Sequence, residues 1–283
     1  MTTDNTFPTH RLYGHPVPEP ERVQAVTRSI PEFPDQTPRQ AVRNYLNMAL
    51  LGQGRGWVYV STGKTATSST LHFLYQMQFG HPLTARFVPE NDINPSAIIH
   101  ALAEHGVFSR ALLEGLSSID IRALDAPRLL SVRNPYDRAV SAFRYLCKSQ
   151  EAAKPWFLRE RLRLDAAVGF DWDSMSGTVE GLRRFLTFLQ MEIDAFGVHS
   201  LNPHWRPQVA CCHPSVFQPD IVGRTEDLPA FFAEVAQRMD RPMPEDVISE
   251  NVQGNDTSSL SSDPEARRLI ETIFASDFET FGY

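Results

Sequence analysis

The chain has 283 residues, a formal net charge of −7 at pH 7 and 22% charged side chains, which suits one soluble α/β domain with insertions. The acidic balance argues against general binding to nucleic acids or anionic membranes, because both require a basic surface. No apolar run reaches the roughly 18 residues that span a bilayer, and the polar, Pro-rich start differs from a secretory signal. The three cysteines, Cys147, Cys211 and Cys212, indicate buried reduced thiols in a cytoplasmic protein rather than a disulfide framework.

Residues 1–37 are predicted to form an extended, loosely packed arm, because prolines interrupt any helix there. The remaining residues, 38–283, are predicted to form a single α/β domain. The spacing of apolar residues predicts helices over 39–51, 68–79, 135–148, 228–239 and from 264 onward, and a helical region over 151–200 that breaks around 169–177. Short apolar runs predict strands at 57–60, 128–132 and 215–223. Alternating strands and helices indicate a parallel sheet flanked by helices.

The turn after the first predicted strand has some features of a nucleotide-binding loop, through Gly63-Lys64-Thr65. In the pattern GxxxxGK[ST], however, the first glycine would fall at Val58, inside the strand. The second predicted strand ends in Arg133-Asn134, not in the aspartate that holds Mg²⁺ in many ATP-binding proteins. A P-loop-like kinase or ATPase is therefore a minority alternative.

The same turn still has the chemistry of a phosphate cradle. A strand that enters a helix through small residues points backbone N–H groups at one spot. Lys64 adds a positive charge, and hydroxyl donors follow at Thr65, Thr67, Ser68 and Ser69. Taken alone, the pattern fits a Ser/Thr-rich helix start with a solvated lysine equally well.

A second candidate anion site follows the second predicted strand. Arg133 lies where this strand gives way to a helix, the edge at which α/β sheets bind ligands. Its guanidinium can bind a phosphate with two parallel hydrogen bonds, and Ser141 adds a hydroxyl. Arg138 is better explained by a structural ion pair on the helix face. A donor with two separated phosphate-like groups would span both sites.

These segments resemble the carbohydrate-type sulfotransferases that use 3′-phosphoadenosine 5′-phosphosulfate (PAPS), the group that includes chondroitin 4-O- and heparan 2-O-sulfotransferases. Residues 64–69 fit the family's first motif from its lysine onward, and residues 132–141 fit the second motif throughout. Residues 202–228 and 275–283 resemble two later family segments, in the same order. One departure is Gly63, which stands where the family usually has proline.

The resemblance implies transfer of a sulfonate group from PAPS, with no metal ion. Lys64 would act in catalysis, by stabilising the oxygen that bridges sulfur to the departing phosphate. The residues expected to hold the donor are Lys64, Thr65, Ala66, Thr67, Ser68, Ser69, Arg133, Ser141 and Arg224.

For the acceptor, the resemblance favours a hydroxyl on a carbohydrate or glycolipid. That hydroxyl needs a base within reach, and His105 and His204 are the two candidates that the sequence leaves open. Trp205 is better explained as a core residue than as a sugar platform, and the aromatic residues of 275–283 as a packing element. A non-catalytic module that binds 3′-phosphoadenosine 5′-phosphate (PAP) or a glycan is a further alternative.

Overall fold

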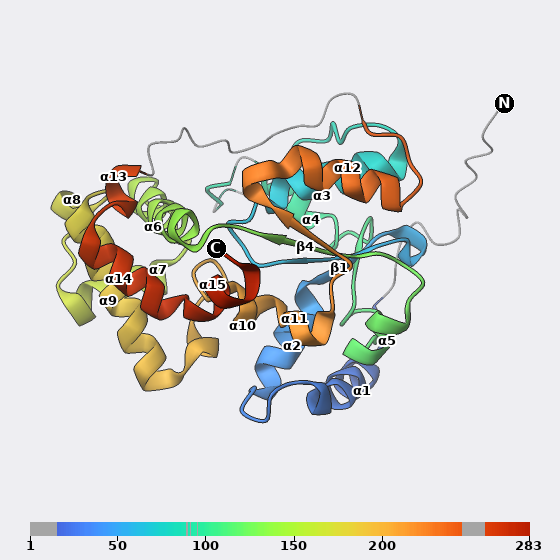
Figure 1. Cartoon of the computed structure of the whole chain (residues 1–283), viewed down its shortest axis with the longest axis horizontal. Coiled ribbons are helices and arrows are strands. Elements are labelled where there is room, and N and C mark those ends of the chain that lie inside the picture. Colours follow the sequence, from blue (N-terminus) through green and yellow to red (C-terminus); the bar gives the residue numbers. More distant parts are fainter. Residues whose placement is uncertain (1–15, 89, 91, 95, 245–257) are drawn as a thin grey trace.

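The computed structural model describes residues 16–88, 90, 92–94, 96–244 and 258–283. Its centre is a five-stranded mixed sheet with the strand order β3-β1-β2-β4-β5 (Figure 1). Strands β2, β4 and β5 are parallel, with Val60 opposite Leu130 and Leu130 opposite Val222. Strand β1 is antiparallel to both of its neighbours. The strands are β1 (Ala49–Leu51), β2 (Val58–Ser61), β3 (Ser109–Arg110), β4 (Arg128–Val132) and β5 (Ile221–Arg224).

The expectation of a wholly parallel sheet is therefore wrong for two strands, although the α/β class is confirmed. Strand β1 lies within the run read as one helix over 39–51, because α2 (Arg39–Met48) ends before it. Three residues are too few to reveal a period of two. The strand expected over 215–223 is also shorter, because α11 (Pro214–Phe217) takes up its first part.

The N-terminal segment departs most from expectation. Residues 1–15 of the expected arm lie outside the described residues, but α1 (Glu19–Ser29) and η2 (Ile30–Glu32) are helical rather than extended. Pro20 and Pro31 each lie in the first turn of a helix, where a missing N–H breaks no intrahelical hydrogen bond. Ala25 and Val26 of α1 are buried in the same hydrophobic core as Val60 of β2.

Side chains alternate between the two faces of the sheet, as the period of two requires. Val60 and Leu130 face a core shared with α1, α2, α5 (Ser118–Ala123) and α11. Tyr59 and Leu129 face the opposite core, which α3 (Thr67–Phe79), α4 (Ala97–Ala101) and α12 (Leu228–Arg238) cover. Figure 1 shows these two helical layers above and below the sheet.

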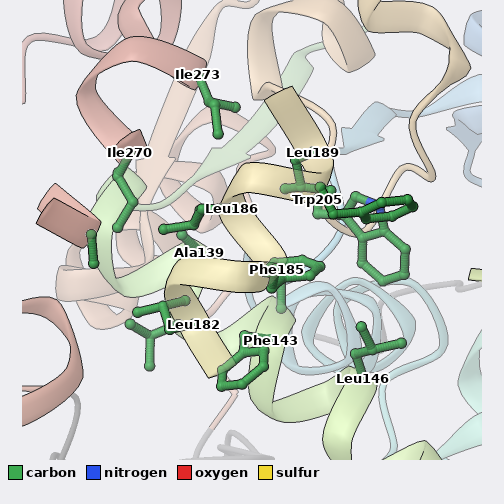
Figure 2. Close-up of a cluster of buried hydrophobic side chains, with 14 of the residues drawn as sticks. Ala139, Phe143, Leu146, Leu182, Phe185, Leu186, Leu189, Trp205, Ile270 and Ile273 are labelled. Atoms are coloured by element: carbon green, nitrogen blue, oxygen red, sulfur yellow. The ribbon is translucent and has the colours of Figure 1, made fainter. Parts of the chain in front are cut away.

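A third core lies beside the sheet, among helices. Figure 2 shows Phe143 of α6, Phe185 of α9 and Ile270 of α14 meeting in it. Trp205, only 2% exposed, belongs to this core, so its interpretation as a core residue is confirmed. The single helix expected from residue 264 is two helices, which divide at Phe274. The helices of this region are α6 (Pro135–Glu151), α7 (Leu158–Val168), α8 (Trp172–Met175), α9 (Val179–Phe196), α13 (Ser258–Ser261), α14 (Pro264–Ile273) and α15 (Ala275–Phe281).

Candidate active site

The turn from β2 to α3 has a strained backbone. Gly63, Lys64 and Ala66 have φ angles of 70°, 61° and 55°. For the two residues that are not glycine, this left-handed conformation costs about 1–2 kcal/mol each. Such strain persists only where the surrounding structure enforces it, and it gathers at binding sites. Left-handed residues in a turn also give the backbone the concave form whose N–H groups bind anions.

Gly63 brings a distant segment against this turn. A Cβ atom at position 63 would lie 3.2 Å from the Pro203 carbonyl oxygen and 3.4 Å from the Cα atom of His204. Proline at this position is incompatible with the observed backbone, because its ring holds φ near −65°. The glycine therefore permits the close approach of residues 203–204 to the lysine turn.

Arg138 ties the turn, helix α6 and the 203–204 segment together. Its side chain is 1% exposed. It donates hydrogen bonds to the carbonyl oxygens of Thr62 at 2.8 Å, Gly63 at 3.0 Å and Pro203 at 3.2 Å. The structural interpretation of Arg138 is thus confirmed, but its partners are backbone carbonyls rather than a carboxylate.

The hydroxyls that follow Lys64 have partners within the protein. The Thr65 hydroxyl lies 3.1 Å from that of Ser131 in β4, and the Thr67 hydroxyl is hydrogen-bonded to Ser61. The Ser68 hydroxyl lies 3.0 Å from Nε2 of His100, a residue that the sequence analysis missed. Ser69 is buried at 1% exposure. The hydrogen bonds of these side chains within the protein hold the turn in place. Contact between the same side chains and a ligand stays a prediction.

Lys64 and Arg133 form a cationic pair at the ends of two adjacent parallel strands. The Arg133 guanidinium donates to the Lys64 carbonyl oxygen at 3.5 Å. Burial, together with the positive charges of Arg133 and Lys148, lowers the pKa of Lys64 to about 8. Within the described part of the chain, no ion pair joins Lys64 or Arg133 to a carboxylate. Half-buried cations without a carboxylate at ion-pair distance favour the binding of an anion. From farther away, Asp137 and Glu226 offset part of the charge of Arg133, whereas the charged neighbours of Lys64 are all cations.

Helix α6 contributes one face to this site. Arg138, Ser141, Tyr145 and Lys148 follow one another at spacings of three and four residues, which places them on one side of the helix. The Nζ atom of Lys64 lies 3.9 Å from the centre of the Tyr145 ring, a cation–π contact. Sequence reasoning missed Tyr145, although its position four residues after Ser141 could have revealed it.

A buried polar network fixes the backbone of Arg133. The Arg133 N–H donates to Oε1 of Gln208, and Nε2 of Gln208 donates back to the Arg133 carbonyl oxygen, both at 2.9 Å. The carboxylate of Asp277, which has no exposed surface, accepts from the backbone N–H groups of Gln208 at 2.8 Å and Val209 at 2.9 Å. The packing interpretation of the C-terminal segment is confirmed by Phe281, which is 8% exposed. The segment also positions Arg133, through residues that the sequence analysis missed.

Arg224 lies at the end of β5, and it contacts the end of the chain. Its guanidinium donates to the Phe281 carbonyl oxygen and lies 4.4 Å from the centre of the Tyr283 ring. Glu226 accepts from the Asn134 N–H at 2.7 Å and from the Tyr283 hydroxyl at 3.2 Å. This turn makes structural contacts, and a nucleotide contact by Arg224 stays a prediction.

His204 lies beside Lys64 with one defined tautomer. Oδ1 of Asn202 accepts from the His204 backbone N–H at 3.1 Å and lies 2.8 Å from Nδ1 of the same residue. A backbone N–H can only donate, so the amide atom facing it is the oxygen, and Nδ1 carries the ring proton. Nε2 is left with a lone pair. Burial and the charge of Lys64 lower the pKa of His204 to about 3, so the ring is neutral at pH 7.

The structure does not bring His105 to the same place. His105 is exposed in the turn after α4. The next two carbonyl oxygens, of Gly106 and Val107, accept from the Gln53 side chain at 3.0 and 2.7 Å. Gln53 precedes the amino end of β2, whereas Lys64 follows its carboxyl end. Of the two candidate bases, only His204 adjoins the cationic pair.

Three further features of the described residues concern metal ions, membranes and thiols. In the part of the chain that the structure describes, no group of three or more His, Cys, Asp or Glu side chains could hold a metal ion. No helix among the same residues is both long and apolar enough to cross a bilayer. The three cysteines are free and buried.

The fold and the site define a mixed α/β protein in which a neutral histidine adjoins a half-buried lysine at the carboxyl edge of the parallel strands. The chain belongs to the sulfotransferase family, whose model matches residues 58–283. It is 25% identical over 192 residues to carbohydrate sulfotransferase 12 of Xenopus laevis, across 63% of this chain and 44% of that relative. The chain thus spans less than half the length of this relative. No solved structure gave a significant match. The resemblance to the carbohydrate-type sulfotransferases is confirmed.

Proposed function

We propose that this protein transfers a sulfonate group from PAPS to a hydroxyl group of a carbohydrate. The observation that carries the proposal is the pair of cations without carboxylate partners, Lys64 and Arg133, at the ends of β2 and β4. Membership of the sulfotransferase family and the likeness to a carbohydrate sulfotransferase support the same activity.

The two cations would divide the donor between them. The turn of residues 63–67 would hold the 5′-phosphosulfate with backbone N–H groups, as a P-loop holds phosphates, and Lys64 would lie at its bridging oxygen. Arg133 and Ser141 would bind the 3′-phosphate, which ATP lacks. Lys64, Arg133 and Arg138 lie close enough for their positive charges to act on one another, so the site fits a polyanion. Arg138 already donates to backbone carbonyl oxygens, so Lys64 and Arg133 are the two of these cations that would contact the donor.

The transfer would break the bond between sulfur and the bridging oxygen and form a bond between sulfur and the acceptor oxygen. The electron pair stays on the bridging oxygen, where Lys64 stabilises the growing negative charge. The hydroxyl proton passes to Nε2 of His204, while Asn202 holds Nδ1–H. A bound polyanion would offset the field of Lys64, which would raise the pKa of His204 above about 3 and strengthen the base.

Calorimetry provides the test. PAP should bind without metal, with a dissociation constant of about 1 μM or tighter, and ATP should bind more weakly with or without Mg²⁺. Tighter binding of ATP with Mg²⁺ would contradict the proposal. PAP binding without sulfonate transfer to any of a panel of glycans would instead indicate a binding module without enzymatic activity.

A further inference from the structure

A hollow lies next to His204 on the surface of the protein. Its volume is about 440 Å³, within the range of small-molecule sites. The residues that line it come from the start of α7 and the segment before α10 (Gln208–Cys212). They are Pro155, Trp156, Phe157, Glu160, Asn202, Pro203 and His204.

The polar groups of this hollow mostly accept hydrogen bonds. The Glu160 carboxylate is an acceptor only, and one of its oxygens already accepts from Nδ2 of Asn202 at 3.3 Å. Because Nδ1 of His204 donates to Asn202, the remaining nitrogen, Nε2, is an acceptor. A ligand for this hollow must therefore supply several O–H or N–H donors.

Aromatic rings provide the apolar part of the hollow. Trp156 is half-buried, and its ring meets that of Phe157 edge to face, with the centroids 5.7 Å apart. Phe157 is 8% exposed and packs edge to face on His204 at 5.0 Å. Its φ of 59° is strained for a bulky residue. Trp156 and Glu160, which lie before and after that strained residue in the chain, both line the hollow.

The charge of the hollow restricts the ligand further. Glu160 and His204 are its ionisable lining residues, so it contains a carboxylate and, at neutral pH, no cation. A carboxylated or sulfated ring placed here would meet the like charge of Glu160, and in the complex with PAP the charge of Lys64, which adjoins His204, would already be offset by the phosphates of PAP.

We propose that this hollow, defined by Trp156, Glu160, Asn202 and His204, binds an uncharged sugar ring of the acceptor. The sugar packs its C–H face on Trp156 and donates hydroxyls to Glu160. The hydroxyl to be sulfated lies at Nε2 of His204. This inference rests on the proposed function, and it specifies an acceptor that carries no negative charge on the ring that reacts.

Saturation-transfer NMR on the complex with PAP tests this directly. The probes are methyl β-glucopyranoside and methyl β-galactopyranoside, each compared with its uronic acid. We expect each neutral glycoside to bind at least about tenfold more tightly than its uronic acid, because one charge-assisted hydrogen bond is replaced by repulsion. Equal affinities, or no signal from either neutral glycoside, would overturn the inference.

Two variants locate the effect. Glu160→Gln keeps an oxygen that can accept from Asn202 but removes the charge, so the preference for the neutral glycoside should fall to about twofold or less. Trp156→Leu should weaken the neutral glycosides severalfold without changing that preference. The matched control is Glu180→Gln, on an exposed glutamate that pairs with Arg184 on α9, and it should change neither quantity.

PAP affinity, measured by calorimetry on the same samples, separates the two proposals. If the wild-type protein does not bind PAP, the proposed function fails. If every variant binds PAP normally but Glu160→Gln keeps the full preference for neutral glycosides, only the acceptor hollow is wrong.

Discussion

The turns after β2 and β5 occupy equivalent places at the carboxyl edge of the parallel strands, yet they differ in how their charges are used. After β2, Lys64 has a left-handed backbone and an ammonium group whose described contact is an aromatic ring. After β5, Arg224 and Glu226 are exposed and bonded to the end of the chain itself. Both turns combine a basic residue with the start of a helix, so position at the sheet edge does not distinguish them.

The difference shows which features indicate a ligand site. Strain at Lys64 and Ala66 opposes folding, and the unpaired ammonium opposes burial. Such features persist where function requires them, whereas charges bonded within the chain are explained by the fold alone. The predictions that follow test whether the two turns differ in function as they do in structure.

The largest expected effect is on catalysis by the turn after β2. Lys64→Ala should slow single-turnover sulfonate transfer by about 10²–10³-fold, because it removes a preorganised group that stabilises the transition state. PAP affinity should fall far less, since PAP has lost the sulfonate. Lys64→Arg should rescue poorly. A folded Lys64→Ala protein that transfers at nearly the wild-type rate would remove Lys64 from the mechanism.

Arg133 and Arg224 allow a direct comparison of the two sheet-edge positions. Arg133→Ala should weaken PAP binding by about 1.5–3 kcal/mol through loss of a charge-assisted contact. It should affect adenosine 5′-phosphosulfate, which lacks the 3′-phosphate, much less. Arg224→Ala should weaken PAP binding less than Arg133→Ala does, even if Arg224 contacts the nucleotide, because its guanidinium is already bonded to the Phe281 carbonyl oxygen. If calorimetry gave equal losses for both variants, the distinction between the turns would not hold.

Gly63 tests whether the strained turn depends on close packing. Gly63→Ala places a methyl group 3.2 Å from the Pro203 carbonyl oxygen at a φ of 70°, so we expect the free energy of unfolding to fall by more than the about 1–2 kcal/mol that a left-handed backbone alone costs. Gly54→Ala is a matched control, because it has a φ of 64° and nothing within 4 Å of the added atom. Denaturant titration should show the larger loss at position 63, together with weaker PAP binding in that variant alone.

The smallest predicted effect is a pH dependence of PAP binding. The pKa of Lys64 is about 8, and a bound anion should raise it because the charged form is favoured. Affinity should therefore be constant well below pH 8 and fall above it, by at most tenfold per pH unit. Calorimetry in buffers of different ionisation enthalpy should show proton uptake in this range. Lys64→Ala should abolish the uptake, and its persistence in that variant would assign it to another group.

Local signals in the sequence were enough to find the centre of the site. The apolar runs of β2 and β4 are buried strands, and α6 begins at Pro135 as expected. Its cap is Asn134, which accepts from the Tyr136 N–H at 2.9 Å. Lys64 and Arg133 follow these strands directly, so their shared sheet edge could be predicted from chain order. These features depend on residues within a few positions of one another.

The tertiary structure decided how the site is completed. Gln208 lies 75 residues from Arg133 along the chain, and Asp277 lies 69 residues from Gln208. Likewise, Asn202 and Glu160 are 42 residues apart. Asn202 and the choice of His204 over His105 emerge only when these segments pack together. Periodicity and capping record the preferences of neighbouring residues, whereas contacts between distant segments depend on how the helices pack on the sheet. The sequence by itself therefore determined the strands β2 and β4 and the basic residues that follow them, and the packing of distant segments decided which side chains surround those residues.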